Sequence, residues 1–249
     1  MMFMLPLFKS NFSIGKSILR LDEKSFEEDS PSSIFKILKD NDIQNLVLVE
    51  DTMIGFLESY HNCRNFGVNL IFGLNLFYKS STDQESKDKI TIFSKNEKGC
   101  KSLNKIYSFA QTEGDGSIDF LNLKKIWTDD LLMYIPFYDS FLYNNFMYFS
   151  ESYCDLSFFN PCFFIQNNNL PFDGPLKERV IKFCKKNKFK TMLSKSIYYN
   201  KKSDLSAYQV YKCLCSRSFS NKASLEKPNL DHCSSADFSF ESFLEHESS

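Results

Sequence analysis

Short apolar runs alternate with amphipathic helical patterns between residue 18 and about residue 216. This alternation is typical of repeated strand–helix units that build a largely parallel sheet. The apolar runs predict strands at residues 18–21, 45–51, 69–78, 89–93, 131–136, 162–166 and 189–194. The pattern therefore predicts one α/β domain of roughly seven strand–helix repeats.

Helix start and stop signals separate these strands. Pro31 follows Asp29 and Ser30 and stands where a first helical turn would begin. The helix expected over residues 53–66 is followed by Gly67, a residue suited to the left-handed cap that ends many helices. Further helical patterns cover residues 103–110, 175–188 and 204–216.

The loss of the alternation after residue 216 divides the chain into a barrel domain over residues 1–216 and a tail over residues 217–249. The tail is rich in serine, so we expect it to be loosely attached. It sets four apolar residues among serines and carboxylates: Phe238, Phe240, Phe243 and Leu244. These residues suit either a docking peptide for a partner such as a sliding clamp or packing of the tail on its own barrel.

Composition narrows the class of protein. Hydrophobic residues make up 43% of the chain and charged residues 24%, with a formal net charge of −1, which excludes a disordered chain. The opening MMFMLPLF has no basic segment and is too short for a signal sequence or a membrane span, so it predicts a strand or packing segment. The eight cysteines include no C-x-x-C pair, which fits a reduced compartment. We therefore expect a cytoplasmic protein without membrane contact.

A cluster of basic residues lies between residues 177 and 202, which contain ten Lys or Arg residues and one acidic residue, Glu178. Such a cluster attracts nucleic-acid phosphates, because neutralising them releases counterions. The candidate nucleic-acid-binding residues are Lys185, Lys186, Lys188 and Lys190. The alternative is the solvated lysine face of an amphipathic surface helix. No GxGxxG, GxxxxGK[ST] or GxSxG motif occurs in the chain.

Five stretches occur in the order and approximate spacing of one known domain. They are LRLDEKSF, LVLVEDTMIGFLESYHNCRNFGVNLIFGLNLF, ITIFSKNEKGCKSLNKIYSFAQTEG, IDFLNL and SKSIYYNKKSDLSAYQVYKCL. Over about residues 16–216 the chain resembles the PHP domain that opens bacterial DNA polymerase III alpha subunits. The resemblance implies an α/β fold, a distorted (β/α)7 barrel of the PHP type. The remaining residues are too few for a polymerase core, so the resemblance implies a stand-alone domain.

The resembling domains bind a cluster of metal ions through His-x-His after the first strand, Asp-His after the second, Gly-x-Glu in the third, and later Asp and His residues. The matching positions here are Asp22 and Lys24, Asp51-Thr52, Gly73-Leu74-Asn75, Lys195-Ser196 and Ala207-Tyr208. Most ligands are thus replaced, and lysines at two positions oppose the entry of a cation. We expect no catalytic and no metal-binding residue. One possibility remains open, a single Mg²⁺ or Mn²⁺ bound through Asp22, Glu23, Asp51 and Asn75.

The resemblance and the replaced ligands together favour a catalytically inactive PHP-like domain that acts as a binding or structural component in DNA replication. The partners implied are a polymerase core or clamp, with possible DNA contact through the lysine cluster. The alternative is a divergent metal-dependent phosphoesterase or exonuclease of the PHP family. A bound cofactor is expected only under that alternative.

Overall fold

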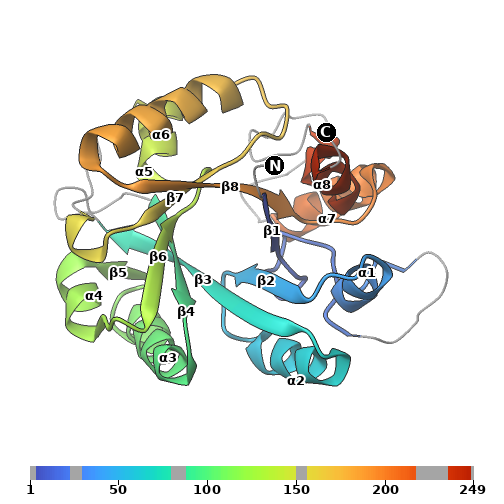
Figure 1. The fold of residues 1–249 in the computed structure, drawn as a ribbon, viewed down its shortest axis with the longest axis horizontal. Coiled ribbons are helices and arrows are strands. Elements are labelled where there is room, and N and C mark those ends of the chain that lie inside the picture. Colours follow the sequence, from blue (N-terminus) through green and yellow to red (C-terminus); the bar gives the residue numbers. More distant parts are fainter. Residues whose placement is uncertain (1–3, 23–29, 80–87, 150–155, 217–234, 248–249) are drawn as a thin grey trace.

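The fold was analysed in a computed structural model, which describes residues 4–22, 30–79, 88–149, 156–216 and 235–247. Seven strands form a closed ring in the order β1-β8-β7-β6-β4-β3-β2, and β2 pairs again with β1 (Figure 1). Among the described residues, an eighth strand, β5, pairs with the last three residues of β3 and lies outside the ring. The strands are β1 (Leu5–Phe8), β2 (Asn45–Glu50), β3 (Asn69–Lys79), β4 (Asp88–Ser94), β5 (Ser117–Asp119), β6 (Leu131–Ile135), β7 (Cys162–Ile165) and β8 (Lys190–Ile197). The prediction of an α/β barrel is confirmed.

Helices surround this ring of strands (Figure 1). They are α1 (Ile34–Asp40), α2 (Phe56–Phe66), α3 (Glu97–Thr112), α4 (Phe120–Ile126), α5 (Phe141–Met147), α6 (Asp173–Asn187), α7 (Leu205–Cys215) and α8 (Phe240–Glu247). Short 3₁₀ turns lie at η1 (Ser157–Phe159), η2 (Lys202–Asp204) and η3 (Ala236–Phe238). Gly67 ends α2 with a φ of 65°, the left-handed conformation that a side chain would disfavour. No helix among the described residues is long and apolar enough to cross a membrane.

The first strand of the barrel differs from the predicted one. The structure places it at Leu5–Phe8, within the opening apolar segment, where it pairs with β2 and β8. Residues 18–21 form no regular strand and make only an isolated bridge between Arg20 and Ser33. Residues 5–8 form the strand because their backbone pairs with a strand on each side, β2 and β8, whereas residues 18–21 do not pair on both sides.

One strand breaks the expected parallel order. β4 is antiparallel to both of its neighbours, β3 and β6, whereas the other pairings of the ring are parallel. The start of β4 therefore lies at the end of the barrel where the parallel strands finish. This reversal brings residues from the beginning of β4 to the carboxyl end of the other strands.

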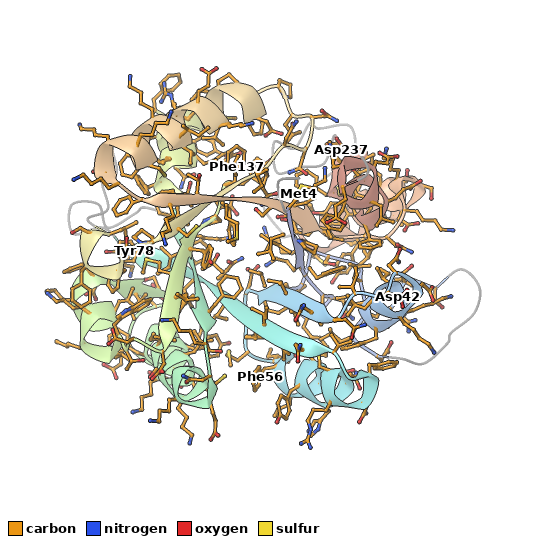
Figure 2. All side chains as sticks on the ribbon, in the orientation of Figure 1. Met4, Asp42, Phe56, Tyr78, Phe137 and Asp237 are labelled. Carbon is orange, nitrogen blue, oxygen red and sulfur yellow. The ribbon has the colours of Figure 1, made fainter. Side chains whose placement is uncertain are left out.

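Two apolar layers hold the barrel together. The larger cluster lies between the sheet and the surrounding helices. The smaller one fills the inside of the ring, where side chains occupy the space between the strands (Figure 2). It comprises Leu7, Val47, Val49, Phe93 and Phe164, with Leu5, Tyr134 and Met192 packed against them. Gly73 belongs to this layer, because a Cβ atom there would lie 2.4 Å from Cε1 of Phe93.

Residues 235–247 of the predicted tail are not loosely attached. Phe238, Phe240 and Phe243 are all buried in the larger apolar cluster. Backbone hydrogen bonds continue the contact, since Tyr198 N donates to Phe238 O at 2.9 Å and Phe240 N donates to Tyr199 O at 3.0 Å. This part of the tail therefore follows the second of its two interpretations, packing on its own barrel. Residues 217–234 lie outside the described part of the chain.

Candidate functional site

Polar side chains line the barrel interior at the carboxyl ends of the parallel strands. Because successive side chains of a strand alternate between its faces, the interior-facing positions continue to Lys9 after β1 and to Asp51 after β2. Lys89 joins them from the start of the reversed strand β4. Lys9 and Lys89 line a pocket of about 60 Å³, which we call the carboxyl-end pocket, and Asp51 is bonded to the ammonium group of Lys9. Its polar lining consists of Lys9, Asn75, Lys89, Thr91, Tyr138, Asp139, Gln166, Ser196 and Tyr198.

Asp51 is the centre of a short chain of hydrogen bonds on one side of this pocket. Lys9 Nζ lies 2.7 Å from Asp51 Oδ1, and Asn75 Nδ2 donates to the same oxygen at 3.1 Å. The hydroxyl of Thr91 in turn donates to Asn75 Oδ1 at 2.6 Å. Four consecutive members of the ring, β1, β2, β3 and β4, are thus joined through these side chains.

The surroundings of Asp51 favour its charged form. Burial acts to raise the pKa of this carboxyl group. The positive charges of Lys9 and Lys89, with the hydrogen bonds from Lys9 and Asn75, outweigh burial and hold the pKa well below its ordinary value of 3.8. Asp51 is therefore a carboxylate at neutral pH, and an ammonium group already neutralises it.

A second ion pair lies on the other side of the same pocket. Lys89 Nζ is 3.0 Å from Asp139 Oδ2, and the backbone N–H of Lys89 donates to Asp139 O at 2.8 Å. Asp139 lies in the loop after β6, so this pair joins β4 to the loop that follows its neighbour. The carboxyl-end pocket thus carries two positive and two negative side chains in neighbouring pairs.

Glu50 fixes the loop that carries Lys9. The backbone N–H of Ser10 donates to Glu50 Oε1 at 2.8 Å, and the Ser13 hydroxyl donates to Glu50 Oε2. Ser13 also accepts a hydrogen bond of 2.9 Å from the backbone N–H of Asp51. Burial raises the pKa of Glu50, although Lys9 and the two serines oppose the rise. Glu50 is thus a buried structural carboxyl group, committed to the backbone of the β1 loop.

Amide and hydroxyl groups cover the opposite wall of the pocket. Gln166 Nε2 donates to Ser196 Oγ at 2.9 Å, and Asn168 Nδ2 donates to Gln166 Oε1 at 3.1 Å. This series of hydrogen bonds continues to Tyr138, whose hydroxyl group donates to Asp173 Oδ1 at 2.9 Å. Burial and the nearby charge of Asp173 raise the pKa of Tyr138 well above its ordinary value. This wall therefore presents neutral hydrogen-bonding groups.

The residue that follows the first strand of the barrel differs from the one predicted from the sequence. Because β1 ends at Phe8, Lys9 stands there, and Asp22 does not. Asp22 instead forms an ion pair with Arg20 at 2.9 Å. Neither residue borders the carboxyl-end pocket. Outside the described residues lie two further candidates, Glu23 and Lys24.

The remaining candidate positions are divided between the pocket and other places. Asp51 and Asn75 do meet, as expected from their positions on β2 and β3. Ser196 lines the pocket, whereas Lys195 is buried on the other face of β8 and donates to Asn167 O at 3.2 Å. Tyr208 lies on α7, where its ring packs against the rings of Tyr198 and Tyr199.

Three charged residues of the pocket were missed by the sequence analysis: Lys9, Lys89 and Asp139. Lys9 had a detectable signal, since it ends the opening apolar segment in the way that Asp51 ends a later strand. Lys89 had none, because its place depends on the reversal of β4. Asp139 lies four residues beyond Ile135, the last residue of β6, so its place depends on the path of a loop.

The lysine cluster lies at the other end of the barrel. Lys185 and Lys186 occupy the last turn of α6, Lys188 follows as its left-handed cap with a φ of 59°, and Lys190 begins β8. All four are exposed. β8 begins at the amino end of the barrel and reaches the pocket only at Ser196. The structure therefore separates the lysine cluster from the carboxyl-end pocket by the length of a strand.

These observations define a β/α barrel with a polar pocket at the carboxyl ends of its strands. A comparison with protein-family profiles matches residues 27–159 to the PHP domain, and this match covers more than half of the chain. The chain therefore belongs to the PHP domain family. A search of curated proteins gives no match.

The residues of the pocket do not fit the metal cluster that this family implies. Asp51 and Asp139 each contact a lysine ammonium at 2.7 and 3.0 Å, so a cation is already beside each carboxylate. Glu50 is engaged by Ser10 and Ser13. Within the described parts of the chain, no three His, Cys, Asp or Glu side chains are grouped so that they could hold a metal ion.

Proposed function

We propose that this chain is a catalytically inactive PHP barrel of the DNA polymerase III alpha type. In this proposal it is a cytoplasmic protein that serves as a binding or structural component in DNA replication. The observation that carries the proposal is the Lys9–Asp51 ion pair, in which Nζ lies 2.7 Å from the carboxylate after β2. The replication context rests on the order of the sequence stretches that resemble the polymerase domain.

Coulomb repulsion is the physical reason for the loss of hydrolysis. A metal-dependent hydrolytic site needs carboxylates and imidazoles that converge on the ions, which then acidify bound water. In the carboxyl-end pocket, Lys9 and Lys89 contact the available carboxylates, and both lysine side chains are largely buried. A divalent ion would have to displace ammonium groups that are weakly screened by water.

The proposed binding role rests on the structural features that the barrel retains. The two apolar layers and the linked polar groups give a rigid scaffold whose outer surface can hold other molecules. The partners we propose are a polymerase core or a sliding clamp. The aromatic residues of the tail do not serve this purpose, because Phe238, Phe240 and Phe243 are buried against the barrel.

A second candidate is a divergent phosphoesterase of the PHP family. One observation favours it, since Asp139 lines the pocket, Asp51 is bonded to the lining residue Lys9, and carboxylates can bind Mg²⁺ or Mn²⁺. The candidate requires the lysines to leave these carboxylates when a metal ion enters.

A phosphoesterase assay separates the two candidates. Purified protein is incubated with Mn²⁺ and either p-nitrophenyl phosphate or end-labelled DNA, in parallel with the Asp51→Asn variant. We expect the same background hydrolysis from both proteins, because no metal-bound water forms at the pocket. Turnover by the wild-type chain that disappears in the Asp51→Asn variant would establish the second candidate and overturn the first.

A further inference from the structure

The amino end of the barrel exposes apolar side chains that belong to its interior. Ile71 and Leu132 are 39% and 40% exposed, although both occupy interior-facing positions of their strands. Tyr134 follows Leu132 on the same face of β6 and is partly exposed. Above them the rings of Phe93 and Phe164 close the barrel, with centroids 5.2 and 4.7 Å from that of Tyr134. This end of the barrel therefore exposes apolar side chains and an aromatic ring, with the polar pair Asn45 and Asn69 on the same face of the sheet.

A line of directly paired residues connects that ring to the lysine cluster. Tyr134 on β6 pairs with Cys162 on β7, and Cys162 pairs with Lys190 on β8. Residues paired across neighbouring strands share a face of the sheet, so all three face the inside of the barrel. Two strand spacings place Lys190 about 10 Å from Tyr134 along the backbone. An aromatic residue and a lysine thus share one face of the sheet, two strands apart.

Three more lysines extend the positive charge away from the barrel mouth. Lys185, Lys186 and Lys188 are exposed at the end of α6, immediately before β8. The negative end of the α6 dipole favours cations in its last turn, which explains Lys185 and Lys186. It does not explain Lys190, which lies beyond the helix. Asp129 and Asp130 stand at the same end of the barrel, before β6.

We propose that this amino-end surface binds single-stranded nucleic acid. One base lies against Tyr134, Ile71 and Leu132, and the phosphates follow the lysine cluster along β8 and the end of α6. Single-strand binding proteins combine the same two elements, base stacking on aromatic rings and a positively charged path for the backbone. Asp129 and Asp130 disfavour a backbone path over β6 and so direct it toward α6. This proposal deepens the proposed function by naming a ligand class, and it uses the end of the barrel opposite to the altered PHP site.

Salt dependence of binding tests the contribution of the lysines. Fluorescence anisotropy measures the affinity of the wild-type chain for labelled oligothymidylate between about 50 and 200 mM salt. Four phosphate contacts predict a slope of about −2.8 in a plot of log K against log salt. The variant Lys185→Glu/Lys186→Glu/Lys188→Glu is expected to lose most of the affinity and about 2 units of this slope.

A matched charge change shows whether position matters. Lys36, Lys101 and Lys105 are exposed on α1 and α3, away from the lysine cluster. Their triple replacement by glutamate alters the net charge of the protein by the same amount. We expect its affinity to stay within about threefold of wild type, because long-range effects between exposed charges are screened at these salt concentrations.

The base contact has its own pair of variants. Tyr134→Leu keeps an apolar side chain but removes the stacking ring, and we expect the affinity to fall roughly tenfold. Tyr60→Leu removes a partly exposed tyrosine from α2 and is expected to leave the affinity unchanged. Circular dichroism of each variant confirms that it remains folded.

Two results would overturn this proposal. One is the absence of oligothymidylate binding by the wild-type chain at about 50 mM salt. The other is an equal loss of affinity in the two triple variants, which would show attraction by net charge alone. Neither result bears on the phosphoesterase assay, so failure here is distinguishable from failure of the proposed function.

Discussion

Replacing Lys9 with methionine is expected to lower the free energy of unfolding by about 3 kcal/mol, because it leaves the Asp51 carboxylate without its ammonium partner. The Lys9 side chain is 8% exposed and that of Asp51 is 27% exposed, so water can compensate only in part. Asn75 still donates one hydrogen bond to Asp51. Urea unfolding followed by the fluorescence of Trp127, the single tryptophan, measures the effect.

Two further variants test whether this loss of stability comes from breaking a buried ion pair. Lys9→Met/Asp51→Leu removes both charges, and we expect it to be more stable than Lys9→Met alone, because matched apolar groups replace a buried pair at little cost. Lys101→Met breaks the exposed Lys101–Glu97 pair on α3 and should change stability by about 0.5 kcal/mol or less. Equal effects of Lys9→Met and Lys101→Met would show that the pocket ion pair contributes no more than a surface pair.

Replacing Phe238 with alanine is expected to lower the free energy of unfolding by about 3–5 kcal/mol. Phe238 is fully buried, and its ring stacks on that of Tyr198 with centroids 5.3 Å apart. Removing it leaves a cavity between η3 and the end of β8. The same urea unfolding experiment measures the change, since the tail residues and the barrel share one apolar cluster.

Phe149→Ala is the matched control for this prediction. Phe149 is 90% exposed, so the same change of residue type removes little buried surface and should alter stability by about 0.5 kcal/mol or less. A Phe238→Ala variant as stable as this control would mean that the tail is only loosely attached, as the sequence analysis expected.

Local rules of chain geometry made much of the fold predictable. Strand and helix repeats follow from hydrophobic periodicity, and the end of α2 at Gly67 follows from the conformational freedom of glycine. The opening segment was predicted as a strand or packing segment, which β1 confirms, but the strand predicted at residues 18–21 was wrong. The apolar runs at residues 5–8 and 18–21 have similar composition, and only pairing with β2 and β8 distinguishes them.

The carboxyl-end pocket was predictable only where strand order and alternation decide the contact. Asp51 and Asn75 meet because β2 and β3 are consecutive, parallel and in register. Lys89 reaches the pocket only because β4 is reversed, and Asp139 pairs with it only because β6 neighbours β4. Such contacts between residues far apart in sequence arise from the closure of the barrel, which no local pattern encodes.

The attachment of the tail was also not predictable from a local sequence pattern. Its serine-rich composition predicted loose attachment, yet the four residues from Phe240 to Phe243 bury two aromatic rings against the barrel. The spacing of the aromatic residues was visible in the sequence. The surface that receives them was not, because it is formed by β1, β8 and α7 together.

Direct titration of metal-stripped protein with Mn²⁺ tests the central claim, that lysine ammonium groups occupy the place of the PHP metal cluster. Isothermal titration calorimetry compares the wild-type chain with the Asp51→Asn variant. We expect no binding isotherm at the pocket, so the two proteins should give the same heats. Stoichiometric binding of one or more Mn²⁺ ions by the wild-type chain, lost in Asp51→Asn, would contradict the claim.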